Sequence, residues 1–138
     1  MIPPAAGLAF HHVGVACTDI ASETAHFATL GYVPEGESFE DRVQGIRGMF
    51  MAGQSPRVEL LEPLRANAPG VLEPWLSQRI KLYHLAYVAP DLSDAIASLR
   101  SQRGKLVAPP VPAVAFGGRN IAFVMLPNRL LVELISSS

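Results

Sequence analysis

Two histidines and two glutamates interrupt stretches of the sequence that are otherwise apolar. His12 and His84 each lie in a short apolar run, and Glu59 and Glu133 each lie between valine and leucine in a further run. Removing a charged carboxylate from water is costly unless something compensates the charge. A divalent metal ion removes that cost, and two imidazoles with two carboxylates are a suitable ligand set. Metal binding is therefore one candidate chemistry for this chain.

Each of the four residues also has an ordinary interpretation. A histidine in a strand is usually a satisfied core or surface residue, and a strand glutamate usually faces water because side chains alternate. The pairing favours the metal site, since the same residue type occupies the same point of two similar segments. His11 and His26 have no histidine counterpart, so the ordinary interpretation applies to them, and alternation points His11 away from His12.

The sequence repeats itself over most of its length. His84 follows His12 by 72 residues, and the two Val-Glu-Leu segments are 74 residues apart. Asp19 and Asp91 occupy equivalent points, each before a helical pattern of apolar residues, where aspartate is a good N-cap. We therefore expect each half to contain one strand, one helix and about three further strands.

Turn-forming residues separate the expected elements. Gly31 and Gly104 are expected to end the two helices as C-cap glycines. Two irregular, proline-containing stretches, 64–81 and 108–118, are candidate lids or binding loops, and 73–76 can open a short helix. Apolar runs predict strands at residues 10–16, 46–52, 57–63, 82–88, 121–126 and 130–135.

Composition narrows the class of protein. The 138 residues suit a single domain, 1–138, with a real core, because 49% are hydrophobic and 17% charged. A net charge of −1 gives no basic excess for nucleic acid, and no apolar stretch is long enough to cross a membrane. Cys17 is the one cysteine, which excludes an intrachain disulfide, favours a reducing cytoplasm and is consistent with a buried thiol.

These residues resemble the vicinal oxygen chelate superfamily, which includes glyoxalase I, methylmalonyl-CoA epimerase, extradiol dioxygenases and bleomycin-resistance proteins. The resemblance implies an α+β fold in which two tandem βαβββ modules form a cupped mixed sheet, a glyoxalase-like barrel, around a metal ion. Module one is expected at about 8–63, a connecting segment at 64–81, and module two at about 82–135. The family's ligands lie on the first and last strands of each module, which implies His12, Glu59, His84 and Glu133 here.

Within the superfamily, several segments are most similar to methylmalonyl-CoA epimerases. One position departs from them: a glutamate, a proposed acid/base group, usually precedes the Gln-Gly pair, whereas this chain has Val43, which cannot transfer a proton. Glu40 and Asp41 are close in sequence but out of register. The segments that carry the similarity are 11–16, 44–46, 58–64, 115–123 and 127–128.

The resemblance implies a divalent-metal-dependent isomerase or lyase that transfers a proton next to a carbonyl, like methylmalonyl-CoA epimerase acting on an acyl thioester. The cofactor would be one Co, Ni, Zn or Mn ion, and Glu59 and Glu133 would be both ligands and catalytic residues. The expected partners are an acyl-CoA or thiol adduct and a second copy in a homodimer, with no nucleic acid or membrane. Arg47, Lys81 and Arg119 are candidates for binding anionic parts of the substrate.

Besides a structural or regulatory relative that keeps the metal but has lost the base, for which Val43 is the reason, two other functions stay open at this point. One is a lyase like glyoxalase I (lactoylglutathione lyase), in which a metal-bound glutamate acts as the base, and Val43 gives that arrangement weight. The other is a non-catalytic, drug-sequestering member that binds a small molecule, although such members typically lack the metal ligands. A ring-cleaving dioxygenase fits less well, because a fourth ligand at Glu59 would occupy a position needed for substrate or oxygen.

Overall fold

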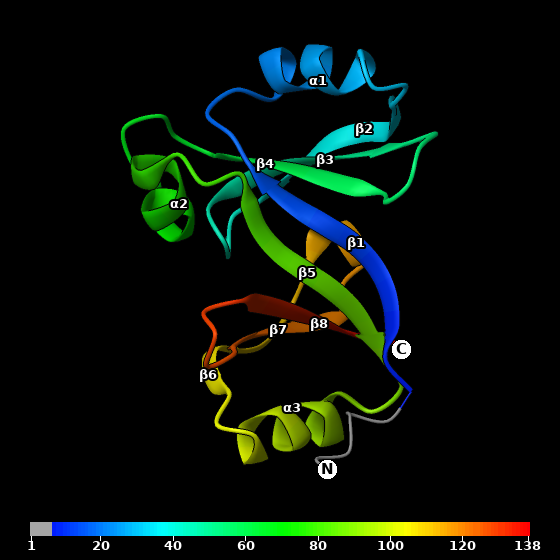
Figure 1. Cartoon of the computed structure of the whole chain (residues 1–138), viewed down its shortest axis with the longest axis vertical. Helices are drawn as coiled ribbons and strands as arrows, with labels where there is room; N and C mark the ends of the chain where they lie inside the picture. Colours follow the sequence, from blue (N-terminus) through cyan, green and yellow to red (C-terminus); the bar gives the residue numbers. More distant parts are fainter. Residues whose placement is uncertain (1–6) are drawn as a thin grey trace. The chain divides into compact units, whose positions relative to one another are not determined.

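The computed structural model describes residues 7–138, so residues 1–6 of the expected domain lie outside the described part. The chain forms two compact units, residues 12–83 and residues 7–11 with 84–138. In each unit one long helix covers a mixed sheet (Figure 1). No helix in residues 7–138 is long and apolar enough to cross a membrane.

In the unit of residues 12–83, the sheet has the strand order β2-β3-β4-β1. Strands β1 and β4 are parallel, and the other two pairings are antiparallel. The first strand begins in the other unit and crosses into this one, since the division falls after His11. The elements are β1 (Ala9–Ala16), α1 (Ile20–Ala28), β2 (Val33–Asp41), β3 (Ile46–Ala52), β4 (Val58–Pro63), the 3-10 turn η1 (Gly70–Leu72) and α2 (Glu73–Gln78).

The other unit repeats this plan with the strand order β5-β8-β7-β6, in which β5 and β8 are parallel. The expected α+β class and the repeated strand, helix and three strands are confirmed. Strands β2 and β6 are edge strands, each paired with one neighbour. The strands therefore do not close into the expected barrel. The elements are β5 (Leu82–Ala89), α3 (Leu92–Ser101), β6 (Lys105–Pro112), the 3-10 turn η2 (Val114–Phe116), β7 (Asn120–Met125) and β8 (Leu131–Ser136).

The two long helices begin where the aspartates predicted. The carboxylate of Asp19 accepts a hydrogen bond of 3.1 Å from the Ser22 N–H, and that of Asp91 accepts one of 3.0 Å from the Asp94 N–H. Each bond satisfies an N–H group that has no partner within the helix. Both N-cap predictions are therefore confirmed.

The two helices end differently. Gly31 follows α1 with a φ of +95°, a conformation that favours glycine, as predicted. After α3 the left-handed residue is Arg103, with a φ of +71°, so the C-cap prediction for Gly104 was wrong. Gly104 is required for a different reason, because a Cβ there would lie 2.6 Å from the Leu99 carbonyl oxygen and 2.9 Å from Val124 Cγ1.

The proline-containing stretch 108–118 is not wholly a loop. Strand β6 extends to Pro112, and the 3-10 turn η2 follows it. The sheet tolerates these prolines because β6 is an edge strand, where a missing N–H disrupts no pairing on the open side. The short helix expected within 64–81 is present as α2, with proline in its first turn.

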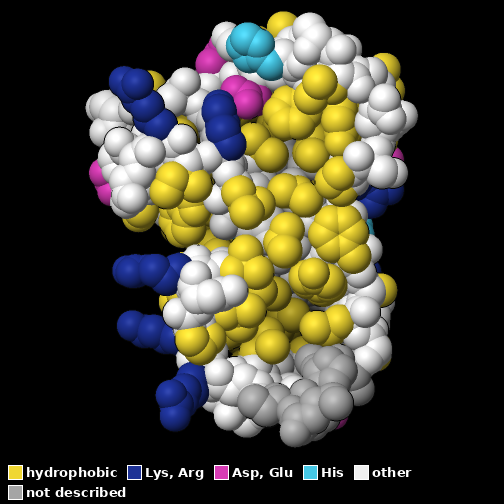
Figure 2. All heavy atoms as spheres, viewed as in Figure 1, with side chains coloured by type: hydrophobic (Ala, Val, Ile, Leu, Met, Phe, Trp, Pro, Cys, Tyr) yellow, Lys and Arg dark blue, Asp and Glu magenta, His cyan; other side chains and the backbone are white. Residues whose placement is uncertain are grey.

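Helix α1 covers the core of its unit only partly. A groove of about 320 Å³ remains beside the helix, lined mainly by apolar side chains that include Val13, Val15, Phe27 and Leu82. Figure 2 shows apolar side chains gathered on this face of the unit. The buried polar residues lie on the opposite face of the sheet, because neighbouring side chains of a strand alternate between its two faces.

Candidate metal centre

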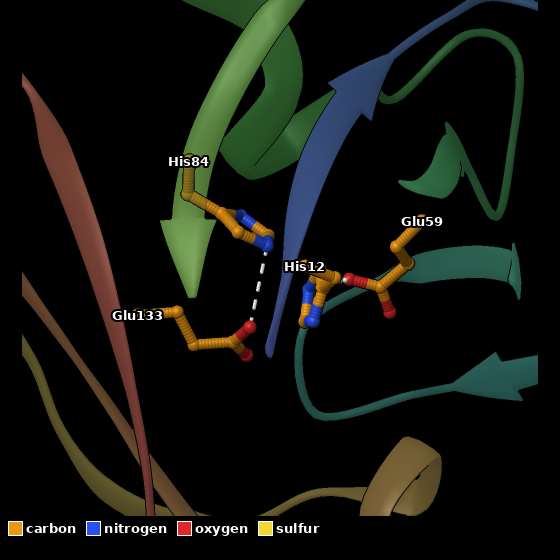
Figure 3. A group of neighbouring side chains, drawn as sticks. All are labelled: His12, Glu59, His84 and Glu133. Carbon is orange, nitrogen blue, oxygen red and sulfur yellow. Dashed lines mark hydrogen bonds and ion pairs between the residues drawn. The ribbon is translucent and has the colours of Figure 1, made fainter. Parts of the chain in front are cut away.

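His12 and Glu59 form a buried pair on the sheet of their unit. Strands β1 and β4 run parallel with Gly14 opposite Glu59, and His12, two residues before Gly14, shares its face of the sheet. A hydrogen bond of 3.0 Å joins His12 Nε2 and Glu59 Oε1 (Figure 3). His12 is fully buried and Glu59 is 3% exposed. The parallel pairing of the first and last strands of the module thus creates the pair.

His84 and Glu133 form the corresponding pair in the other unit. Strands β5 and β8 are parallel with Ala86 opposite Glu133, and His84 lies two residues before Ala86. His84 Nε2 lies 3.2 Å from Glu133 Oε1, and the two residues are 1% and 3% exposed (Figure 3). The register that joins the two residues is the same as in the first pair. All four predicted site residues are therefore buried, and each histidine lies beside the glutamate of its own module.

Each histidine ring also contacts a phenylalanine that the sequence interpretation missed. Phe50 lies opposite Glu59 on β3, and its ring centroid is 5.1 Å from that of His12. Phe123 lies opposite Glu133 on β7, 5.4 Å from the His84 ring. Both contacts are edge-to-face, a favourable geometry that restricts the orientation of the imidazole. The sequence repeat could have indicated that these two phenylalanines are equivalent, because they are 73 residues apart.

The donor set of these residues suits a metal ion. Two buried imidazoles and two buried carboxylates are a group that could hold one. If the imidazoles are neutral and the carboxylates ionised, each pair carries one negative charge among buried side chains. A divalent cation compensates two such charges, which hydrogen bonding to neutral groups alone does not. The residues present therefore fit a divalent metal in both number and chemical type.

Two of the cations suggested as substrate contacts are already held in ion pairs. Arg47 Nη2 donates a hydrogen bond of 2.8 Å to Glu40, and Lys81 Nζ donates one of 2.8 Å to Glu23. The hydrogen bond from Arg47 lowers the pKa of the Glu40 carboxyl below its ordinary value of 4.5. Glu40 is therefore an ionised ion-pair partner and is not poised to donate a proton near neutral pH.

The third suggested cation, Arg119, lies beside an aromatic residue of its own unit. Its guanidinium carbon is 5.9 Å from the centroid of the Phe116 ring, and its Nε donates to the Phe116 carbonyl oxygen at 3.3 Å. His11 contacts the same ring edge-on, at 5.5 Å between centroids. His11 and Arg119 thus belong to a local cluster around η2.

The resemblance to epimerases implies a glutamate at position 43. This position lies on the turn between β2 and β3. Val43 occupies this turn and is 70% exposed. Asp41 is buried, and its carboxylate accepts hydrogen bonds from both the backbone N–H and the side chain of Gln44. Neither Glu40 nor Asp41 is therefore an uncommitted substitute for the missing glutamate.

Cys17 is buried, as its apolar neighbours predicted. Burial raises the pKa of its thiol to about 12, and the negative charge of Glu23 adds to the increase. Since the thiolate is the reactive form, Cys17 is protonated and unreactive near neutral pH. A cysteine nucleophile thus has no support in this structure.

Comparison with known proteins relates both the sequence and the fold to one superfamily. The sequence model described as Glyoxalase/Bleomycin resistance protein/Dioxygenase superfamily matches residues 11–123. A relative from Bacillus subtilis, the uncharacterized protein YqjC, is 30% identical over 129 residues, which are 89% of this chain and 88% of the relative. The sequence similarity thus extends over both units.

Solved structures share the fold over nearly the whole chain. A hypothetical protein from Bacillus halodurans, BH1468, gives a TM-score of 0.78 with 21% identity over 96% of each chain. Methylmalonyl-CoA epimerase from Mycobacterium tuberculosis gives 0.74 with 26% identity, over 94% of this chain and 87% of the epimerase. A Streptomyces coelicolor epimerase variant in complex with 2-nitronate-propionyl-CoA gives 0.73 with 24% identity, over 94% and 96%.

Proposed function

Because the chain belongs to the Glyoxalase/Bleomycin resistance protein/Dioxygenase superfamily, we propose that it is a divalent-metal-dependent enzyme which transfers a proton next to the carbonyl of an acyl thioester. The reaction would be of the methylmalonyl-CoA epimerase type. The observation that carries the proposal is the buried His–Glu pair, which occurs once in each unit in the same strand register.

The proposed ligands of one metal ion are His12, Glu59, His84 and Glu133. Support comes from their burial, from their pairing within each unit, and from the match of their charges to a divalent cation. A bound Co, Ni, Zn or Mn ion would act as a Lewis acid on the substrate carbonyl and make the neighbouring C–H more acidic. The ring contacts of Phe50 and Phe123 would keep the imidazoles in a fixed orientation and exclude water around them.

Glu59 and Glu133 are the proposed acid/base groups. An epimerase needs one group to remove the proton and a second to return it on the opposite face. The chain supplies one buried carboxylate from each unit, whereas Val43 has no titratable group and Glu40 is bound to Arg47. Both glutamates would then bind the metal and take part in proton transfer.

The proposed substrate is an acyl-CoA, because the 26% identical solved structure is a methylmalonyl-CoA epimerase. The exposed Val43 favours one second candidate, a lyase of the glyoxalase I type acting on a glutathione adduct. In that reaction a ligand glutamate is itself the base, so no glutamate is needed on the β2–β3 turn. Homodimer formation and a cytoplasmic location stay predictions.

Metal content tests the first part of the proposal. We expect elemental analysis of the purified protein to give about one divalent ion per chain. Glu133→Gln and His84→Ala should lower that content sharply, whereas Glu37→Gln, at an exposed position of β2, should leave it unchanged. A wild-type protein that takes up no metal after reconstitution would overturn the metal site and make a binding module the better interpretation.

Isotope exchange tests the second part. The metal-loaded protein is incubated in deuterium oxide with methylmalonyl-CoA, and separately with the hemithioacetal of glutathione and methylglyoxal. Deuterium incorporation next to the thioester carbonyl supports the epimerase type, and product formed from the hemithioacetal supports the lyase type. Full metal occupancy with neither reaction would contradict both enzymatic proposals.

A further inference from the structure

A second cavity in the unit of residues 12–83 has the properties of an anion-binding site. It has a volume of about 380 Å³ and lies between the turn that joins the end of β2 to the start of β3 and the loop that follows β4. We propose that it binds a phosphate-bearing group of a small molecule. The residues that line it are Glu40, Arg42, Gly45, Leu64, Arg65 and Ala68.

Two hydrogen-bonded turns form a firm frame for this cavity. In the first, the buried carboxylate of Asp41 accepts bonds of 3.1 Å and 2.9 Å from the backbone and side-chain nitrogens of Gln44. In the second, a backbone hydrogen bond of 3.0 Å closes residues 65–68. The Leu64 N–H donates to the Gly45 carbonyl oxygen at 2.9 Å and joins the two turns. The arginines on these turns are therefore held near one another.

Two arginines and one glutamate line the cavity, so its lining carries an excess of positive charge. Arg42 and Arg65 lie on the two turns, and among residues 7–138 neither side chain makes a hydrogen bond or an ion pair, although the positive charge of Arg42 acts on the Glu40 carboxylate. Glu40 is the acidic residue among the described lining residues, and its carboxylate is bound by Arg47 at 2.8 Å. Arg47 is also 3.5 Å from Glu62 and is therefore shared between two carboxylates, which leaves the guanidinium groups of Arg42 and Arg65 as the positive charge available to a ligand.

Guanidinium groups and the cavity size together indicate the class of ligand. The planar fork of arginine matches the oxygen atoms of phosphate and binds them through two parallel hydrogen bonds. Small-molecule sites have volumes of roughly 300–1,000 Å³, so this cavity can hold more than a bare ion. A phosphate monoester or diester on an organic molecule is the ligand that fits both properties.

The cavity is separate from the His12–Glu59 pair of the same unit. Leu64 is five residues beyond Glu59 along the chain, which is about 16 Å in extended backbone. A phosphate bound here therefore lies away from any reacting carbon near Glu59. It belongs either to the remote end of an extended substrate such as a CoA thioester or to a separate phosphorylated molecule.

Binding of adenosine 3′,5′-bisphosphate, which carries the phosphate chemistry of one end of CoA, tests the inference. Backbone amide shifts in the nuclear magnetic resonance spectrum should change at residues 42–45 and 64–68 during the titration. Arg42→Gln and Arg65→Gln should each weaken binding about tenfold or more, because each removes charge-assisted hydrogen bonds. Arg100→Gln, the same charge change at an exposed position of α3, is the matched control and should bind like the wild type.

The outcomes distinguish a phosphate of the substrate from a separate phosphorylated molecule. They also distinguish the proposed anion site from the proposed metal site. Tighter binding of the bisphosphate than of inorganic phosphate supports a substrate tail, and equal binding supports a site for a separate phosphate. Unchanged affinity in the Arg42→Gln/Arg65→Gln double variant, or no saturable binding to the wild type, would overturn the anion site. Glu133→Gln should retain bisphosphate binding, so failure of the metal site and failure of the anion site give different results.

Discussion

The two His–Glu pairs are built alike although the strands around them differ. In both units a parallel pairing of the first and last strands puts the histidine two residues before the partner of the glutamate. In both, a phenylalanine on the neighbouring antiparallel strand lies opposite the glutamate and contacts the imidazole. The repeated feature is thus a group of three residues on three adjacent strands.

The edge strands of the two units show what is not repeated. Strand β2 carries four acidic residues in its nine positions, and most of the strand is exposed. Strand β6 instead contains three prolines in its eight positions and leads into η2. The outer strands therefore diverged in charge and backbone while the inner strands kept the same three residues in the same register. This contrast is expected if the inner groups share one chemical task and the outer strands meet different surroundings.

The largest effects should come from removing one carboxylate from each pair in turn. We expect Glu59→Gln and Glu133→Gln each to lower the rate of proton exchange on the substrate by about 10²–10⁴-fold, the usual contribution of an acid/base group. Rates should be compared at equal metal occupancy, obtained by adding excess metal. The carboxylate that removes the proton should then show the larger loss. A near wild-type rate in one variant would show that only one pair is catalytic.

The two phenylalanines should differ in their effect on stability. Phe123 is 6% exposed and Phe50 is only partly buried. Phe123→Ala should therefore lower the free energy of unfolding by about 3 kcal/mol, and Phe50→Ala by roughly half of that. Urea denaturation measures both values. Phe10→Ala, at a residue that is 49% exposed, is the control and should have the smallest effect.

Metal binding should couple the stability of the protein to both pairs. A ligand at 100 times its Kd stabilises the folded state by about 2.7 kcal/mol. We therefore expect a chelator to lower the Tm of the wild-type protein by several degrees, and added metal to restore it. His12→Ala and His84→Ala should both abolish this metal-dependent shift. A shift that survives in one of them would show that the other pair binds the metal by itself.

The repeat made much of this arrangement predictable. Hydrophobic runs and their polar interruptions predicted the inner strands, the N-caps at Asp19 and Asp91, and the burial of His12 and Glu59. These features depend on the local order of apolar and polar residues, which can be read from the sequence. They also depend on the cost of burying a charge, which follows from the residue type. The contact of each imidazole with a phenylalanine was missed, because it depends on the register between antiparallel strands.

Features that depend on three-dimensional neighbours were predicted less well. The C-cap assigned to Gly104 was wrong because Arg103 adopts the left-handed conformation, and the close approach of Leu99 explains the glycine. Strand β6 was missed because its prolines suggest a loop, and only its place at the sheet edge makes them tolerable. The cavity beside Arg42 was missed because it joins two turns that are distant in sequence.

The smallest predicted effect concerns the charge at the first helix cap. Hydrogen bonds to Asp19 from the Ser22 hydroxyl and, secondarily, from the Ser22 backbone N–H lower the pKa of Asp19 below its ordinary value of 3.8. In α3 the counterpart of Ser22 is Asp94, whose side chain has no hydroxyl to donate. The ionised Asp19 therefore receives a side-chain hydrogen bond for which α3 has no equivalent.

A lowered pKa has a defined consequence for stability. The contribution of Asp19 is fully present above the pKa of the unfolded chain and is lost as the pH falls through the lower pKa of the folded state. Asparagine still caps the helix without the charge, so the wild type should be more stable than Asp19→Asn at neutral pH, and this difference should vanish in acid. Urea denaturation across this pH range measures the difference. Ser22→Ala should weaken the pH dependence, and an unchanged dependence would contradict the role given to the hydroxyl.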